Sequence, residues 1–150
     1  NLEALRANVG QFATVIHAAC TYDDGELALC NAVRPNCMST GGSKVVAAED
    51  VAREAQGEYW PDRRPLPKIT LEQLGQQYGF DRVDLLKLDC EGSEFSILGG
   101  CDLARVRFVV GEYHGQNHWD RFREQRLSGW DYGHMSQSND MGNFHLRNPE

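Results

Sequence analysis

Two pairs of ionisable side chains stand where apolar segments of the sequence give way to turns. Asp89 and Glu91 form the first pair, and Glu112 and His114 form the second. In an extended chain, residues i and i+2 point the same way and lie about 6.6 Å apart. A glycine follows each pair, which permits a sharp turn and the close approach of a ligand. These four residues are therefore the candidate catalytic group of the chain.

Two chemical roles and one structural role are open for this group. His114 or one of the carboxylates could take a proton from a substrate hydroxyl as a general base. The carboxylate oxygens and the imidazole could instead hold a divalent cation. In the structural alternative, Asp89 or Glu91 caps the following helix and His114 is a surface loop residue.

The second half of the chain predicts the elements that position these pairs. Thr70 and Gln73 form a capping box, which starts a helix that Gly79 ends. The segment 83–89 is almost continuously apolar, as is typical of a parallel strand that is covered on both faces. The elements predicted after it are a short helix capped by Ser93, a strand at 106–112, a helix at 118–127 and a terminal hairpin of 130–135 and 143–147.

The alternation of helices and strands predicts an α/β fold with a largely parallel sheet. If the two strands that precede the ionisable pairs are neighbours, they lie about 4.8 Å apart. Both pairs then gather at one edge of the sheet, which is where ligands bind in open α/β sheets.

The first half of the chain carries weaker signals. Segments 2–9 and 46–56 are predicted helices, and segments 12–20 and 26–32 are predicted strands, the first of them largely buried. Loops are predicted at 34–43, which is rich in small polar residues, and at 58–67, which holds three prolines. We interpret residues 21–69 as an excursion from a single domain that covers residues 1–150.

The composition is that of an ordinary globular protein. The 150 residues carry a net charge of −7, with 41% apolar and 25% charged residues, which is too apolar for a disordered chain. No run of about 18 apolar residues occurs, so we predict no membrane span. The expected location, the cytoplasm, follows from the cysteines. The negative net charge disfavours nucleic acid as a partner, because Lys and Arg bind its phosphates. The five cysteines include no C-x-x-C pair, so we interpret them as small buried hydrophobes in a reducing compartment.

One continuous segment, residues 69–100, carries a longer and more specific pattern. It has Thr70-Leu71 at a helix start, the strand 84–89, and then Glu91-Gly92, Glu94 and Leu98. This pattern resembles the FkbM-type methyltransferases that depend on S-adenosylmethionine (SAM), whose strand reads approximately DLLKxDxEGxE. Looser likenesses extend the resemblance over most of the chain and lie at 1–8, at 41–43 and at 112–114.

The resemblance implies a doubly wound, mostly parallel sheet with the strand order 3-2-1-4-5-7-6. Segments 12–20, 83–89 and 106–112 would be its third, fourth and fifth strands. The terminal hairpin would supply the antiparallel sixth and seventh strands.

The resemblance also implies an activity, which is transfer of a methyl group from SAM to a hydroxyl oxygen of a sugar or natural product. The partner would be that small-molecule acceptor. Ala18 and Ala19 would lie near the adenine of SAM, and Asp89 would face the methyl-transfer site. The family motif does not settle which member of the candidate catalytic group is the base.

Two parts of the family pattern lie outside this sequence: a glycine-rich loop after the first strand and an acidic residue after the second, both of which hold SAM. We therefore expect the chain to be the later part of the domain, with further residues before Asn1. Closure of the sheet in another way, or a second chain in the gap, are the alternatives. Two other functions stay open, namely a non-catalytic binding module of methyltransferase ancestry and a metal-dependent hydrolase.

Overall fold

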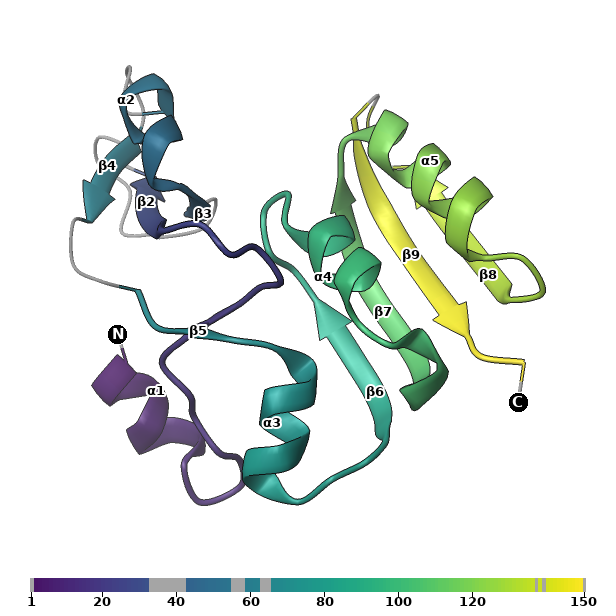
Figure 1. Ribbon diagram of the computed structural model, residues 1–150, viewed down its shortest axis with the longest axis horizontal. Helices are drawn as coiled ribbons and strands as arrows, with labels where there is room; N and C mark the ends of the chain where they lie inside the picture. Colours follow the sequence, from purple (N-terminus) through teal and green to yellow (C-terminus); the bar gives the residue numbers. More distant parts are fainter. Residues whose placement is uncertain are drawn as a thin grey trace.

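Residues 69–149 build the part of the fold that holds the candidate catalytic residues. The computed structural model describes residues 2–32, 43–54, 59–62, 66–136, 138 and 140–149. Residues 69–149 contain a four-stranded sheet. Its strands are β6 (Val83–Leu88), β7 (Val106–His114), β8 (Asp131–Ser136) and β9 (Met141–Arg147), in the order β6-β7-β9-β8 (Figure 1). Strands β6 and β7 are parallel, whereas β9 is antiparallel to both of its neighbours.

The order of these strands agrees with the part of the expected order that they represent, 4-5-7-6. The expectation of a doubly wound, mostly parallel sheet is not confirmed. One of the three strand pairs in this sheet is parallel, and helices α4 (Glu94–Gly100) and α5 (Gln116–Arg126) lie on the same face (Figure 1). The short connection between β8 and β9 forces these strands to pair antiparallel, and β9 then pairs with β7 as well.

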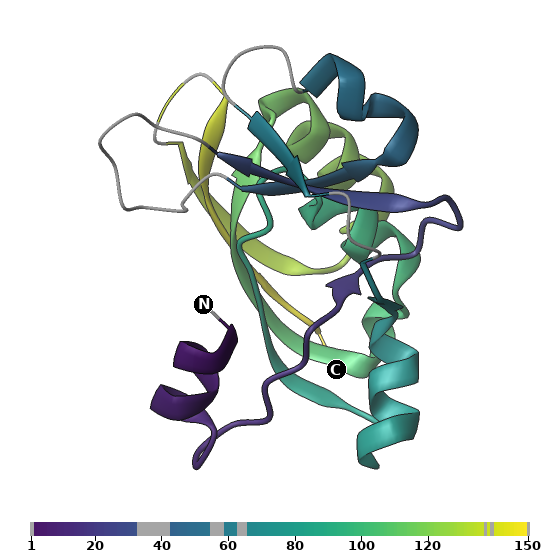
Figure 2. The same ribbon diagram turned by 90° about the vertical axis from the view of Figure 1, so that its left-hand side faces the viewer.

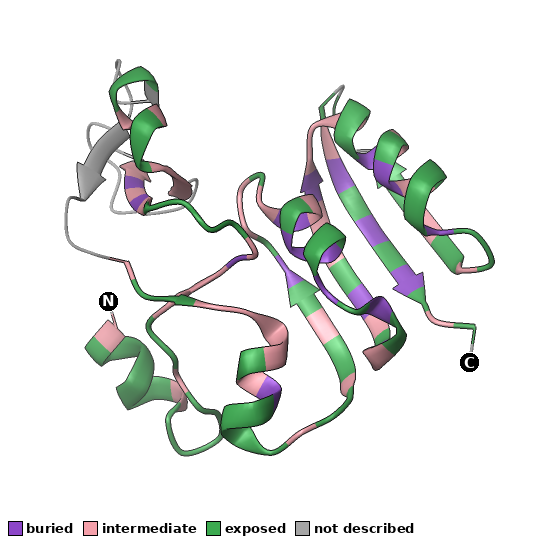
Figure 3. Ribbon diagram, viewed as in Figure 1, coloured by how far each residue is buried: buried purple, intermediate pink, exposed green. Residues whose placement is uncertain are grey.

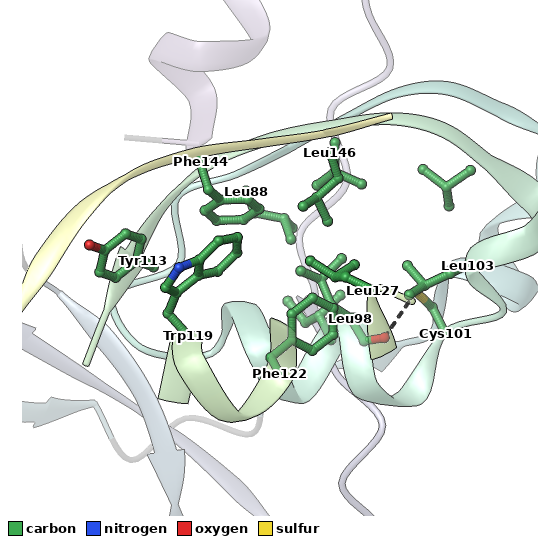
Figure 4. Close-up of a cluster of buried hydrophobic side chains, with 13 residues drawn as sticks. Leu88, Leu98, Cys101, Leu103, Tyr113, Trp119, Phe122, Leu127, Phe144 and Leu146 are labelled. Carbon is green, nitrogen blue, oxygen red and sulfur yellow. Dashed lines mark hydrogen bonds between the residues drawn. The ribbon is translucent and has the colours of Figure 1, made fainter. Parts of the chain in front are cut away.

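The core lies between this face of the sheet and the two helices (Figure 4). Its buried side chains come from both layers and include Leu88, Val109, Phe144 and Leu146 of the sheet and Leu98, Trp119 and Phe122 of the helices. Gly111 faces the same side, and a Cβ atom there would lie 2.7 Å from the carbonyl oxygen of Leu88 and 2.9 Å from the Phe144 ring. The glycine therefore makes room for an aromatic ring packed directly on strand β7.

Exposed residues alternate with buried ones along β9 (Figure 3), so the face of the sheet away from the helices is the more exposed one. Leu85 of β6 is 60% exposed and Val110 of β7 is 36% exposed. The prediction that strand 83–89 is covered on both faces is therefore not confirmed by the described residues.

Helix α3 (Leu71–Tyr78) begins and ends as its sequence predicts. The Thr70 hydroxyl oxygen accepts the Gln73 backbone N–H at 3.2 Å, and the Gln73 side-chain oxygen accepts the Thr70 backbone N–H at 2.8 Å. At the other end Gly79 has φ 75°, and its N–H donates to the carbonyl oxygen of Gly75 at 2.8 Å. The capping box and the glycine stop are thus both confirmed.

The capping box gives a first testable prediction. Replacing Thr70 with Ala will lower the free energy of unfolding by about 1 kcal/mol, because the Gln73 N–H loses its partner in the first turn. Urea unfolding followed by circular dichroism measures the change. The exposed helix residue Gln76 provides the control, since Gln76→Ala will shift the free energy of unfolding by less than about 0.5 kcal/mol. Equal midpoints for the two variants would show that the cap contributes nothing.

The first half of the chain forms smaller units beside the main sheet (Figures 1 and 2). Its elements are α1 (Leu2–Val9), β1 (Ala19–Cys20), β2 (Leu27–Ala32), β3 (Lys44–Ala47), the 3₁₀ turn η1 (Ala48–Asp50), α2 (Val51–Glu54), β4 (Tyr59–Asp62) and β5 (Lys68–Ile69). A second 3₁₀ turn, η2 (Leu103–Arg105), precedes β7. Strands β3, β2 and β4 form an antiparallel sheet, and β1 pairs with β5 in parallel. No helix in the described part of the chain is both long and apolar enough to cross a membrane.

Three predictions for this half need correction. The strand predicted at 12–20 is reduced to β1, which pairs with β5 and not with the main sheet; Pro67 stands next to β5 and has no N–H to extend the ladder. The helix predicted at 46–56 starts later than expected: its first two residues, Val46 and Ala47, belong to strand β3 and pair with β2, and helical turns occupy residues 48–54. The loop predicted at 58–67 includes strand β4, and most of the loop predicted at 34–43 lies outside the described residues.

Candidate functional site

The turn that joins β6 to α4 is held together by a buried carboxylate. Glu94, in the first turn of α4, is fully buried. Its Oε1 atom accepts the backbone N–H of Cys90 at 2.8 Å, and its Oε2 atom accepts that of Gly92 at 3.1 Å. Ser93 occupies the N-cap position of α4, but its side chain makes no capping hydrogen bond. The side chain of Glu94 therefore fixes the turn before the helix, and the cap that the sequence predicts for Ser93 is not formed.

The same turn places Glu91 in an unusual backbone conformation. Glu91 has φ 51° and Gly92 has φ 107°, both in the left-handed region. A non-glycine residue there costs roughly 1–3 kcal/mol and persists only where its surroundings impose it. Here the hydrogen bonds from the turn to Glu94 supply that constraint.

The structure brings His114 against this turn. His114 ends strand β7, and its Nδ1 atom lies 3.3 Å from Oε1 of Glu94. Its Nε2 atom lies 3.4 Å from Oε2 of Glu91. The His114 side chain remains 23% exposed, and that of Glu91 34% exposed. The imidazole is thus held between a buried carboxylate and a partly exposed one.

The other two candidate residues lie apart from this contact. Asp89 pairs with Lys87, with 3.2 Å between the carboxylate and the ammonium group. Residues 87 and 89 are two positions apart at the end of a strand, so they point to the same side. Glu112 is half-buried on β7, where it pairs with Asn143 of β9. The predicted cluster of four is therefore reduced to the contact between Glu91 and His114, with Glu94 as its third member.

The end of β7 is fixed by the tip of the terminal hairpin. Gly115 has φ 96°, and its N–H donates to the carbonyl oxygen of Asp140 at 2.6 Å. The Asp140 carboxylate accepts the Gln116 N–H at 3.1 Å, which caps the start of α5. The hydroxyl of Tyr113 donates to the Gln116 side chain at 2.7 Å. Both residues that flank His114 are thus anchored.

A cavity of about 310 Å³ lies on another side of the same turn. Cys90 and Ser93 of the turn line it, together with Ser96 of α4 and Ala19 of β1. Most of its walls are apolar and come from Ala19, Leu27, Val45, Val46, Ala47 and Ile97. Its polar groups include Asp23, whose carboxylate accepts hydrogen bonds from the hydroxyls of Thr21 at 3.3 Å and Ser96 at 3.4 Å. The cavity therefore offers mostly apolar walls and one carboxylate.

One lysine holds the turn that carries Asp23. The Lys68 ammonium group donates to three backbone carbonyl oxygens, those of Asp23 at 2.9 Å, Asp24 at 3.0 Å and Gly25 at 2.9 Å. Lys68 belongs to β5, where it pairs with Ala19. The β1–β5 ladder and the Asp23 turn are thus fastened to each other at this edge of the cavity.

One of the two alanines that the resemblance placed near the adenine of SAM lines the cavity. Ala19 lines the cavity, whereas Ala18 is half-buried one position earlier and Asp89 directly precedes the lining residue Cys90. Neither Asp23 nor Glu94 is among the site residues predicted from the sequence. The signals were present: a carboxylate shortly after a strand end, and a second one in the first turn of a helix.

The thiols near the site do not have the character of nucleophiles. Burial raises the pKa of the Cys20 thiol to about 11, and burial also raises the pKa of the Cys90 thiol. Both thiols are therefore protonated at neutral pH, and the thiol is the unreactive form. Cys20 and Cys90 are half-buried and Cys30 and Cys101 are buried, whereas Cys37 lies outside the described residues.

Within the described residues, no group of three or more His, Cys, Asp or Glu side chains is arranged to hold a metal ion. The Glu91, Glu94 and His114 side chains meet, but the Glu94 oxygens already face backbone N–H groups.

Residues 2–140 match the family model of the Methyltransferase FkbM domain. No curated protein and no solved structure matches the chain.

Proposed function

Because the chain belongs to the FkbM methyltransferase domain family, we propose that it transfers a methyl group from SAM to a hydroxyl oxygen of a small-molecule acceptor such as a sugar or natural product. One observation carries this proposal: a single turn borders the cavity with Cys90 and Ser93 and presents Glu91 to His114. A bound cofactor and a proton acceptor would therefore be neighbours.

The cavity residues fit an adenosyl group. Apolar walls suit the faces of a purine, and the Asp23 carboxylate can accept hydrogen bonds from an amino or hydroxyl group. The cavity volume, about 310 Å³, lies at the lower end of the range of roughly 300–1,000 Å³ for ligand pockets. Ala19, Asp23 and Ser96 would hold the cofactor, which supplies an electrophilic methyl group when bound.

The residues of the chain then have two tasks. The first is to position the acceptor oxygen in line with the methyl group, which is worth several orders of magnitude in rate. The second is to take the hydroxyl proton. Of the four candidates, Glu91 and His114 contact each other and are both partly exposed, so the proposal places the base in this pair.

A matched pair of serine variants tests the cavity. Ser96→Phe places a ring at the cavity wall, and we expect it to weaken SAM binding about tenfold or more by steric exclusion. Isothermal titration of SAM into the protein measures the affinity. Ser128→Phe adds the same ring at an exposed turn after α5 and will bind SAM as the wild type does.

The outcomes separate the parts of the proposal. Equal SAM affinity in the two serine variants would contradict the assignment of the cavity as the SAM-binding site. Failure of the wild type to bind SAM would contradict the proposal that SAM is the cofactor. SAM binding without methyl transfer to any hydroxylated acceptor would support the non-catalytic binding module instead.

A further inference from the structure

We propose that Glu94 is a positioning residue, which holds His114 with its proton on Nδ1 and so leaves Nε2 to accept the proton of the acceptor hydroxyl. This inference rests on the proposed function and deepens it, because it selects one base and assigns its orientation to a buried residue.

The first step concerns the direction of the hydrogen bond between Glu94 and His114. Both oxygens of Glu94 accept backbone N–H groups of the turn, at 2.8 Å from Cys90 and 3.1 Å from Gly92. These oxygens therefore act as acceptors. A carboxylate oxygen that accepts these N–H groups carries no hydrogen to donate, so the Nδ1 atom of His114, 3.3 Å from Oε1, is the donor in this hydrogen bond. The contact thus selects the tautomer.

The second step concerns the other ring nitrogen. With the proton on Nδ1, neutral His114 carries a lone pair on Nε2. This atom lies 3.4 Å from Oε2 of Glu91, within ion-pair distance, whereas the hydrogen bond of the ring is the one that Nδ1 makes to Glu94. Because the Glu91 side chain is 34% exposed, its carboxylate can turn to solvent and leave the Nε2 lone pair to an approaching hydroxyl. A hydroxyl that approaches there meets a proton acceptor of the kind that general base catalysis needs.

The third step follows the proton. The O–H bond of the acceptor breaks, a new N–H bond forms at Nε2, and the electron pair stays on the oxygen. The imidazolium ion that results lies between the carboxylates of Glu91 and Glu94, whose charges stabilise it. In other histidine bases too, a carboxylate orients the imidazole and stabilises its charged form, while the imidazole accepts the proton.

The fourth step is rigidity. Glu94 is fully buried and is bonded to the turn that also carries Glu91. His114 is flanked by the anchored residues Tyr113 and Gly115. A base must be held in a productive geometry by supporting contacts of this kind.

Nitrogen NMR of the imidazole rings tests the assignment without any substrate. In ¹⁵N-labelled protein, at a pH where imidazole is neutral, long-range ¹H–¹⁵N correlation spectra show which nitrogen carries the proton. We expect His114 to carry it on Nδ1 in the wild type. In Glu94→Gln, the amide can present an N–H to the ring, so we expect the Nδ1–H form to lose its dominance. Glu91→Gln is the matched control and will keep the wild-type tautomer.

Each outcome bears on a different claim. A wild-type His114 with its proton on Nε2, or a Glu94→Gln spectrum identical to that of the wild type, would overturn the positioning role. The wild-type spectrum decides the tautomer even if Glu94→Gln does not fold. Because the measurement uses no SAM, a protein that shows the Nδ1–H form but does not bind SAM would contradict the proposed function and not the orientation of His114.

Discussion

Replacing His114 with Asn will lower the rate of methyl transfer by about 10²–10⁴-fold, the usual contribution of a general base, while the protein stays folded. The Asn side chain can place an N–H near the position of Nδ1 and keep the hydrogen bond to the buried Glu94. It has no atom at the position of Nε2, so the proton acceptor is lost. The rate is measured as S-adenosylhomocysteine formed from SAM with the hydroxylated acceptor that the wild type methylates fastest.

Two controls accompany this variant. His145 is an exposed histidine of β9, and His145→Asn will leave the rate unchanged. Asp89→Asn removes a carboxylate that faces Lys87 and not His114, so we expect a smaller loss than in His114→Asn. If the activity of His114→Asn falls only in step with its melting temperature, the residue is structural and the assignment of the base is wrong.

Replacing Trp119 with Ala will lower the free energy of unfolding by about 3–5 kcal/mol, the largest stability effect that we expect in this chain. Trp119 is fully buried in the core (Figure 4). Its ring stacks on Tyr113 with 5.6 Å between the ring centroids and lies 5.3 Å from the ring of Phe144. Truncation leaves a cavity between α5 and the sheet that rigid neighbours cannot fill.

Trp119→Phe provides the matched control. The indole Nε1 atom is buried, and it has no hydrogen-bond partner among the described residues. Phenylalanine keeps the aromatic contacts and removes this unpaired donor, whose burial costs about 1–3 kcal/mol. We therefore expect Trp119→Phe to be much closer to the wild type than Trp119→Ala in a denaturant titration. A similar loss in both variants would mean that the volume of the indole is not what stabilises this core.

The part of the fold that the sequence predicts well is built from local signals. The capping box at Thr70, the glycine stop at Gly79 and the terminal hairpin all depend on residues a few positions apart, and all three are confirmed. Predictions failed where the partner decides the structure. Strand β3 forms because β2 lies beside it, and a short segment rich in Ala and Glu gives no sign of that partner.

The candidate site divides in the same way. The period of a strand placed Glu91 and His114 at the ends of two neighbouring strands, and the structure brings them within 3.4 Å. The same reasoning included Asp89, which turns to Lys87 instead. Register and strand ends limit where a side chain can be, but the path of the turn after β6 decides which partner it meets.

The sequence by itself determined the local elements and the family pattern from Thr70 to Leu98. It also determined that the ends of β6 and β7 belong to one site. Each of these depends on residue types at short spacing in the chain. Only the tertiary structure decided the role of Glu94. A carboxylate in the first turn of a helix is commonly a solvent-exposed charge. Here the packing of α4 on the sheet buries it, and burial obliges its oxygens to find donors, which are the N–H groups of the turn and the ring of His114.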